Sequence, residues 1–200
     1  MTPVATGRPG RPAAASREDA LALASDRFLE GQRVDVKAIA EELGLARATM
    51  HRWFGTREAF IGEVLATLAE QRLAAIREEI PGTGAGALLE CFDRFNRELA
   101  ATKGLRALLA QEQERALRVV TSSGGVVQPR MVAAIDQLIR AEIDSGAITS
   151  AVASETLAYA IVRLAEAFLY HDAIVGMRGD TERLCEVEAA LLGVERRGSI

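Results

Sequence analysis

Apolar residues recur at helical spacing along most of the chain. Over long stretches they stand three or four residues apart, which places them on one face of an α-helix. Proline, which interrupts helices, is confined to positions 3, 9, 12, 81 and 129. The pattern predicts an all-α protein with about nine helices, over the approximate ranges 16–30, 36–43, 46–54, 57–79, 86–101, 105–120, 129–145, 154–175 and 181–192.

Residues 36–60 contain two short predicted helices joined by a tight turn. Ala40 is small where two helices must touch, and Gly44 stands where the chain needs a left-handed turn residue. Met50 and Trp53 follow at the spacing that anchors the second helix on the first. This layout is typical of a helix-turn-helix, which sets its second helix into the DNA major groove. The alternative is an ordinary helical hairpin with a solvated basic face.

The same segment resembles the end of the DNA-binding domain in the TetR family of bacterial one-component transcriptional regulators. The family pattern is Ser-x-x-Thr-Leu-Tyr-x-His-Phe-x-x-Lys-Glu-x-Leu, and residues 46–60 here are Ala-Arg-Ala-Thr-Met-His-Arg-Trp-Phe-Gly-Thr-Arg-Glu-Ala-Phe. The motif resemblance covers roughly residues 16–64. It implies a helix-turn-helix domain over residues 16–60 and a ligand-binding and dimerisation domain over residues 61–200, preceded by a flexible basic arm over residues 1–15.

Polar side chains on the outer face of the second helix are the candidate DNA contacts. Arg47 and Arg52 are the best candidates for reading bases, because arginine can bind guanine bidentately. The resemblance implies that other residues position the DNA backbone, among them Lys37 and Arg57. The full predicted set is Arg8, Arg11, Lys37, Arg47, Ala48, Thr49, His51, Arg52, Trp53 and Arg57.

Two positions depart from the family pattern. The serine that caps the recognition helix is replaced by Ala46, a loss that typically costs about 1 kcal/mol. The tyrosine that usually reaches the DNA backbone is His51, whose imidazole has a shorter reach. These departures leave an alternative open, namely a small-molecule-binding or interaction protein with weakened DNA binding.

Charge is distributed unevenly along the chain. The formal net charge is −4, yet residues 1–60 contain nine Lys and Arg against eight Asp and Glu, so the acidic excess lies further along. Arg8 and Arg11 stand in a Gly-Arg-Pro repeat that resembles the minor-groove hook of A·T-binding proteins. The alternative is a basic tail that adds only non-specific attraction to phosphates.

The predicted helix over residues 154–175 is apolar on nearly all sides, which is typical of a helix with cover on more than one face. The resemblance implies that the last two helices form a four-helix homodimer interface with their copies. Arg163 and Glu166 stand three residues apart inside this helix, either as a structural ion pair or as a polar anchor for a ligand. The candidate ligand contacts are Phe92, Phe95, Tyr159, Arg163 and Glu166.

The downstream half resembles one subgroup, the QsdR-like regulators tied to degradation of quorum-sensing lactones. The similar stretches are VQPRMVAAI, at residues 127–135, and IVRLAEAFLYHD, at residues 161–172. This resemblance implies an effector of acyl or lactone type. Together, the two resemblances predict a ligand-responsive repressor that binds a palindromic or pseudo-palindromic operator as a dimer.

Other classes of protein fit the sequence poorly. There are only two histidines, and no nucleophile elbow, phosphate-binding glycine loop or metal-ligand spacing is present, so we predict neither an enzyme nor a cofactor or metal site. Cys91 and Cys185 lie in apolar helical patterns and are predicted as core residues. We predict a cytoplasmic protein, because no secretory signal or membrane span is evident.

Overall fold

The computed structural model describes residues 15–171 and 180–195. These residues form ten α-helices and one π-helical segment, η1, with no β-strand among them. Their bounds are α1 Arg17–Leu29, α2 Val36–Glu42, α3 Arg47–Phe54, α4 Arg57–Glu79, α5 Ala85–Ala101, α6 Lys103–Gln111, α7 Gln113–Thr121, α8 Val127–Asp144, α9 Ser154–Glu166, η1 Ala167–His171 and α11 Thr181–Leu192.

The all-α prediction is confirmed, with one more helix than expected. The helix predicted over residues 105–120 is two helices, because the backbone of Glu112 leaves the helical conformation between α6 and α7. At the other end, the helix predicted over residues 154–175 changes to π-helix after Glu166, and residues 172–175 lie outside the described part of the chain.

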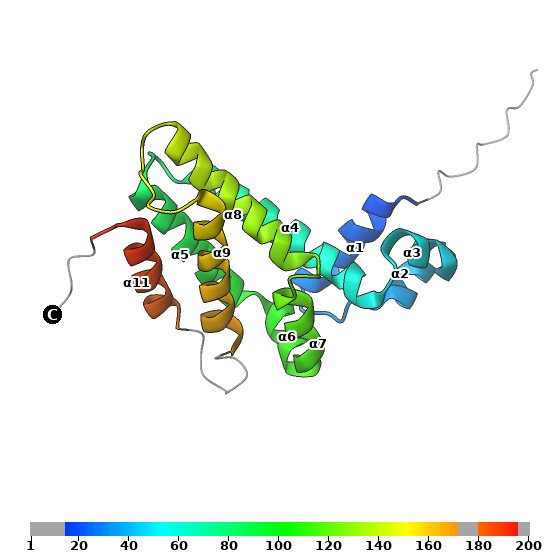
Figure 1. The fold of residues 1–200 in the computed structure, drawn as a ribbon. Helices are drawn as coiled ribbons and strands as arrows, with labels where there is room; N and C mark the ends of the chain where they lie inside the picture. Colours follow the sequence, from blue (N-terminus) through cyan, green and yellow to red (C-terminus); the bar gives the residue numbers. More distant parts are fainter. Residues whose placement is uncertain (1–14, 172–179, 196–200) are drawn as a thin grey trace, which may run out of the picture.

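The helices form two groups joined by a long central helix. Figure 1 shows α1, α2 and α3 at one end of the molecule, and α5, α8, α9 and α11 at the other. Helix α4 runs from the first group into the second, while α6 and α7 pack below the junction. We call residues 15–56 the head and the rest of the described chain the body.

Local capping explains where the head helices begin. Ser16 and Asp19 form a reciprocal capping box, in which the Asp19 amide donates to Ser16 Oγ at 3.1 Å. Asp35 Oδ1 accepts from the Lys37 amide at 2.8 Å at the start of α2. Gly44 adopts the left-handed φ of +64° that turns the chain between α2 and α3. These three features agree with the sequence pattern.

A close contact joins the head to the body. Gly104, in α6, packs so tightly on the end of α1 that a Cβ atom there would lie 2.0 Å from the carbonyl oxygen of Phe28. Only glycine allows this approach. The hydrophobic core is continuous across the junction, from Met50 and Phe60 near the head to Phe92 and Ile139 in the body. Within the described residues, no helix has the length and hydropathy needed to cross a membrane.

Candidate DNA-binding surface and ligand cavity

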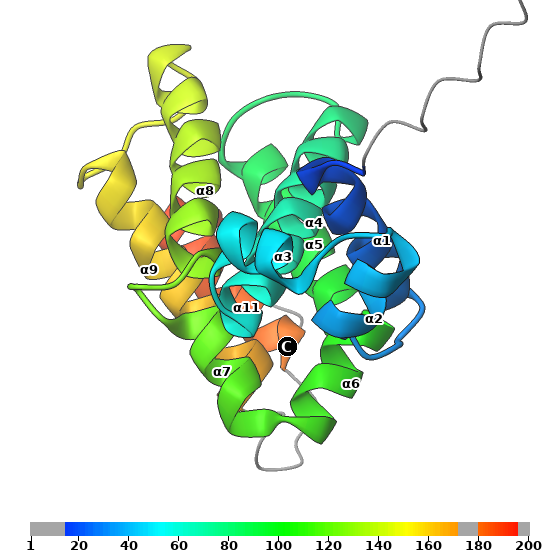
Figure 2. The ribbon, with the colours of Figure 1, turned by 90° about the vertical axis from the view of Figure 1, so that its right-hand side faces the viewer.

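Helix α3 has one buried face and one open face. Met50 and Phe54 are buried, and Trp53 packs beside them with its ring edge-on to Phe54. The exposed positions are Arg47, Ala48, His51 and Arg52, and Thr49 is half-buried. Figure 2 shows α3 at the near end of the molecule, beside α2, with no other part of the described chain in front of it. The predicted base-reading residues therefore lie on an open helix face.

The position of α3 is fixed mainly by contacts with α1 and α4. The Phe54 ring packs against Phe60 at 4.5 Å between centroids, and the Arg17 guanidinium lies 4.8 Å above the same ring. Arg17 also pairs with Glu63 at 3.1 Å, which ties α1 to α4. No side chain caps the start of α3, as expected from Ala46. Packing, rather than capping, holds the recognition helix.

Lys37 is a predicted DNA contact that lies outside α3. Lys37 is exposed at the start of α2 and lies 3.6 Å from the Glu41 carboxylate, an exposed pair that water and salt screen strongly. The ammonium therefore stays available to a phosphate. Arg8 and Arg11 lie outside the described residues.

Arg57, another predicted DNA contact, forms an ion pair within the protein. Its guanidinium forms two hydrogen bonds with the Glu112 carboxylate, at 2.6 and 2.8 Å, and both side chains are partly buried. Arg33 lies 3.3 Å and Arg115 3.7 Å from the same carboxylate. The Arg57 bonds hold the pKa of Glu112 below its usual value. Arg57 therefore links the start of α4 to the α6–α7 junction.

The body contains a cavity of about 450 Å³, within the range of small-molecule sites. Its walls are mainly apolar and come from α4, α5, α8, α9 and η1, and the end of α1 also reaches it. Phe92 and Phe95 both line the cavity. Phe28 and Leu29 of α1 line it as well, so a ligand in this space would touch the head directly.

Of the three polar or aromatic candidates on α9, only Glu166 lines the cavity. Tyr159 is 50% exposed and faces away, because the inward positions of this helix are Leu157, Ala158, Ile161 and Val162. Arg163 is half-exposed and bonds Glu166 at 2.7 Å from the outer side. The predicted ion pair exists, but Tyr159 and Arg163 do not belong to the cavity wall.

Two pairs of carboxyl and amide side chains face the cavity. Asn96 Nδ2 donates to both oxygens of Glu188, at 3.0 and 3.2 Å, and joins α5 to α11. Gln128 Nε2 donates to both oxygens of Glu166, at 3.1 and 3.3 Å, and joins α8 to α9. All four residues are buried and line the cavity. The pairs therefore place hydrogen-bonding groups at two points of an otherwise apolar wall.

Burial changes the protonation of both acids. Glu188 has no exposed surface, and burial raises its pKa to about 7, partly opposed by the bond from Asn96. Burial also raises the pKa of Glu166, although Gln128 and Arg163 oppose the change. Near neutral pH, Glu188 is therefore protonated in a large fraction of molecules.

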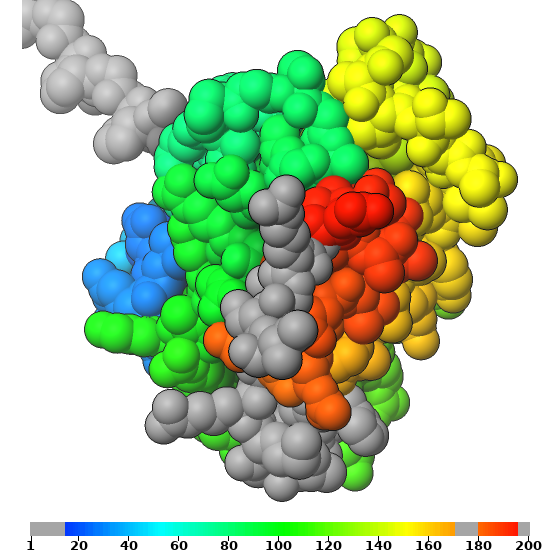
Figure 3. Space-filling view, turned by 90° about the vertical axis from the view of Figure 1, so that its left-hand side faces the viewer, coloured from blue at the N-terminus to red at the C-terminus, as the bar shows by residue number. Residues whose placement is uncertain are grey.

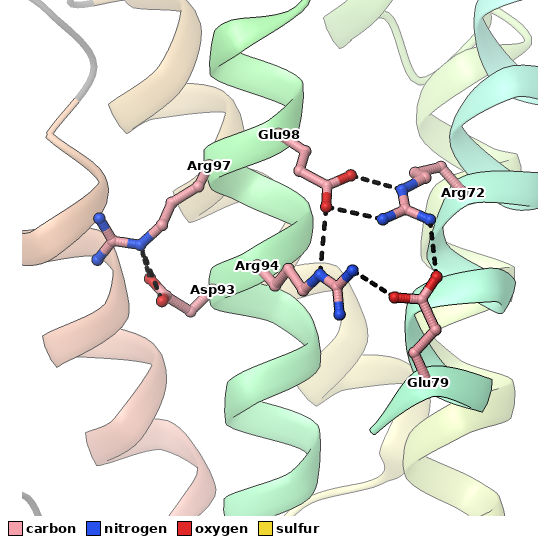
Figure 4. Close-up of polar contacts among 6 residues, drawn as sticks. All are labelled: Arg72, Glu79, Asp93, Arg94, Arg97 and Glu98. Carbon is pink, nitrogen blue, oxygen red and sulfur yellow. Dashed lines mark hydrogen bonds and ion pairs between the residues drawn. The ribbon is translucent and has the colours of Figure 1, made fainter. Parts of the chain in front are cut away.

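The cavity opens to the surface near a cluster of charged side chains between α4 and α5. Figure 4 shows Arg72 and Glu79 of α4 facing Arg94 and Glu98 of α5. Arg72 donates to Glu98 at 2.8 Å and to Glu79 at 3.2 Å, while Arg94 pairs with both carboxylates. Arg72 and Glu98 also line the cavity and are 37% and 39% exposed, which places them at its opening.

Sequence analysis missed Asn96, Gln128 and Glu188. A signal was present for Glu188, because it follows Leu184 and Cys185 at helical spacing and therefore lies on the inner stripe of α11. Asn96 similarly follows Phe92 on the inner face of α5. Gln128 gave no such signal, since it belongs to the first turn of α8, one residue before the predicted start of that helix.

Cys91 and Cys185 are both buried, and burial raises the pKa of Cys91 to about 11. No group of His, Cys, Asp and Glu side chains in the described part of the chain is arranged to hold a metal ion.

The outer face of the last helices is partly apolar. Four large hydrophobic side chains in the described residues are exposed, and three of them, Val152, Tyr159 and Leu191, lie in or beside α9 and α11. Figure 3 shows α11 at the surface at this end of the molecule, with α9 beside it.

The fold and its two sites define a class of protein: a helix-turn-helix head on a hollow helical body. Sequence comparison agrees, because the profile of the tetracyclin repressor-like C-terminal domain matches residues 83–193. The chain belongs to the TetR family of transcriptional regulators. Proteins of this family are DNA-binding regulators and not enzymes, as the sequence predicted. No curated protein sequence matches the chain at a significant level.

Solved structures show the same fold. The transcriptional repressor QsdR of R. erythropolis is 27% identical, with a TM-score of 0.84 over 92% of this chain and 97% of the other. AlkX of Dietzia sp. is 21% identical, with a TM-score of 0.58 over 90% and 99%. FadR of Bacillus subtilis, solved with stearoyl-CoA, is 15% identical, with a TM-score of 0.54 over 90% and 100%. The last two show likeness of fold alone.

Proposed function

We propose that the protein is a ligand-responsive transcriptional repressor. It binds a palindromic or pseudo-palindromic operator as a homodimer and is released by a small, mostly apolar effector, with an acyl or lactone compound as the candidate. Residues 16–60 bind DNA and residues 61–200 bind the effector and the second copy. The observation that carries the proposal is the open polar face of α3 combined with a cavity whose wall includes the end of α1.

The exposed face of α3 supports DNA binding. Arg47 and Arg52 are free of ion pairs within the described residues, so both guanidinium groups are available to base edges. Thr49, His51 and Trp53 lie on or beside the same face, and Lys37 is exposed at the start of α2. These residues contact the phosphate backbone of DNA and so position α3 on it. Arg8 and Arg11 of the arm add attraction to phosphates or enter the minor groove.

Exposed apolar groups support the homodimer. Tyr159 of α9 and Leu191 of α11 are large hydrophobic residues that are 50% and 38% exposed within the described chain. Packing against a second copy buries them and sets the two recognition helices about one DNA turn apart.

Two contacts support coupling between effector and head. Phe28 lines the cavity on one side and touches Gly104 on the other, so an occupant that displaces Phe28 also displaces α1 from α6. Glu112 binds Arg57, beside the head, and approaches Arg33, within it. An effector releases DNA if it favours a head position that fits the operator less well.

Selection of bound sequences from random duplex DNA, at near-physiological salt, tests this function. We expect a two-fold-symmetric motif, whose half-site spacing reports the distance between the two heads. A folded protein that enriches no sequence would contradict operator binding and favour the alternative, a small-molecule-binding protein whose recognition helix is weakened by Ala46 and His51. Sedimentation of the protein with and without the recovered operator tests the dimer separately.

A further inference from the structure

The cavity contains a pattern of polar groups that restricts the chemistry of its ligand. In both carboxyl–amide pairs the amide nitrogen, which is the donor, is directed at the carboxyl group of Glu188 or Glu166. Gln128 Nε2 also donates to the Thr121 carbonyl oxygen, at 3.2 Å, so the amide nitrogens are occupied. The oxygen atoms of each pair keep accepting capacity, and Glu188 can in addition donate when it is protonated. A ligand therefore finds acceptors at two buried points, one between α5 and α11 and the other between α8 and α9.

Positive charge is placed differently from these acceptors. Arg72 is the one cation among the described lining residues, and it lies at the opening, where Glu98 and Glu79 bind its guanidinium. Arg163 pairs with Glu166 from the outer side and does not line the cavity. A negatively charged group carried into the cavity would therefore lose its water and gain no cation, next to two acids.

One more buried group limits the choice. Tyr170 lines the cavity, and burial raises the pKa of its hydroxyl, so it stays neutral. Its O–H group is a donor for a neutral oxygen of the ligand. A polar end that both donates and accepts thus fits the wall better than one that only accepts.

We propose that the cavity binds an apolar ligand whose polar end donates a hydrogen bond and carries no negative charge, such as an alcohol, a secondary amide or an amine. Among acyl or lactone compounds, this selects those that also carry a donor, and it excludes those whose polar end only accepts. Glu188 with Asn96, and Glu166 with Gln128, receive that donor, and the aromatic and aliphatic wall around Phe92 and Phe95 holds the chain. The proposal rests on the proposed function for the biological role of the ligand, but the ligand chemistry is testable without DNA.

Matched ligands with the same alkyl chain test the proposal on the intact protein. Decanol, decylamine, decanoate and methyl decanoate differ only in the polar end, and calorimetry at pH about 7.5 gives a Kd for each. We expect decanol, decylamine or both to bind at least about tenfold more tightly than decanoate and methyl decanoate. Binding of decanoate or methyl decanoate as tight as that of decanol and decylamine overturns the proposal, and so does the absence of binding by all four.

Two variants distinguish a neutral donor from a cation. Glu188→Gln keeps the shape but replaces one acceptor oxygen by an NH₂ donor and cannot become charged, so it should weaken decanol about threefold and, if the amine binds as a cation, decylamine about tenfold or more. Glu90→Gln, on the exposed side of α5, is the matched control and should change neither. If Glu188→Gln changes neither ligand, Glu166→Gln repeats the test at the second pair, and no change there either contradicts the assigned acceptors.

Failure of this proposal and failure of the proposed function give different results. A protein that selects an operator but binds none of the four ligands remains a DNA-binding regulator with a different ligand. A protein that binds decanol or decylamine but selects no DNA sequence keeps the ligand assignment and loses the repressor assignment. Release of operator by the same ligand that binds in calorimetry would join the two.

Discussion

The face of α3 and the wall of the cavity both depend on polar side chains, but these are placed in opposite ways. On α3 the polar residues Arg47, His51 and Arg52 point to solvent, and water satisfies them until DNA arrives. In the cavity, Asn96 and Glu188 are buried and satisfy each other. The exposed polar residues of α3 cost the folded protein little stability when no DNA is bound. The buried pair in the cavity lowers the stability of the fold whenever Glu188 ionises.

The strongest test of this comparison is to separate the two regions at their junction. Gly104→Ala places a Cβ atom 2.0 Å from the carbonyl oxygen of Phe28, which is too close for two non-bonded atoms, and so forces α6 away from α1. We expect a loss of about 3 kcal/mol in the free energy of unfolding, or a fall in Tm of roughly 6–12 °C. Thermal unfolding followed by circular dichroism measures it. Gly86→Ala, which has open space at its Cβ position, is the control and should not destabilise the protein.

The second prediction concerns the buried acid. Glu188 has a pKa of about 7 in the folded protein against an ordinary value of 4.5, so the folded protein retains a proton that the unfolded chain releases. Stability should therefore fall as pH rises from about 4.5 to about 7, and the full loss remains above that range. Asp93 raises this pKa slightly and Asn96 lowers it, while Glu166 and Tyr170 face the same cavity.

Removing the charge should remove this dependence. Glu188→Gln is expected to be more stable than the natural protein at pH 8, by up to about 3 kcal/mol, and equal to it near pH 4. Urea unfolding at several pH values measures the difference. The exposed Glu90→Gln should follow the natural protein at every pH. A Glu188→Gln variant whose advantage is the same at pH 4 and pH 8 would show that the effect is packing and not ionisation.

The third prediction concerns the outward face. Arg47→Ala should weaken operator binding by about 2 kcal/mol, roughly thirtyfold, and leave binding to random duplexes almost unchanged, because a base contact is lost. Lys37→Ala should weaken both kinds of binding alike and reduce the slope of log K against log salt by about one. Fluorescence anisotropy at several salt concentrations measures both. Equal losses on operator and random DNA for Arg47→Ala would remove it from the base-reading residues.

The face of α3 was easier to predict from the sequence than the polar groups of the cavity. The helical spacing of Met50, Trp53 and Phe54 was enough to define the two faces of α3, because a local period decides which side of a helix is buried. The same period placed Phe92 and Phe95 correctly on the inner side of α5. The hydrogen-bond partners of buried polar groups could not be predicted in this way. Nothing local indicates that Asn96 meets Glu188, because the two residues stand far apart in the chain and on different helices.

Arg57 illustrates this limit from the other side. Its position beside the recognition helix matched a family motif and suggested a phosphate contact. Its actual partner, Glu112, comes from a break between two helices that the apolar pattern presented as one. No glycine or proline stands at the break near Glu112, so the sequence did not indicate it. The apolar pattern therefore predicted neither the break at Glu112 nor the ion pair that Glu112 forms with Arg57.

The last prediction concerns the pairing of Arg57 with Glu112 and is the smallest in energy. If Arg57 linked α4 to DNA, Arg57→Ala would lower the salt slope of DNA binding as Lys37→Ala does. Because Arg57 bonds Glu112, we expect the salt slope to stay unchanged and the free energy of unfolding to fall by about 1 kcal/mol. A double-mutant cycle with Glu112→Gln should give a coupling energy of about 1 kcal/mol, since each change removes the same bonds. Additive losses in that cycle would show that the two side chains act independently. In that case the link from body to head would rest on the packing of Gly104 against Phe28, and an effector would reach α3 through apolar contact alone.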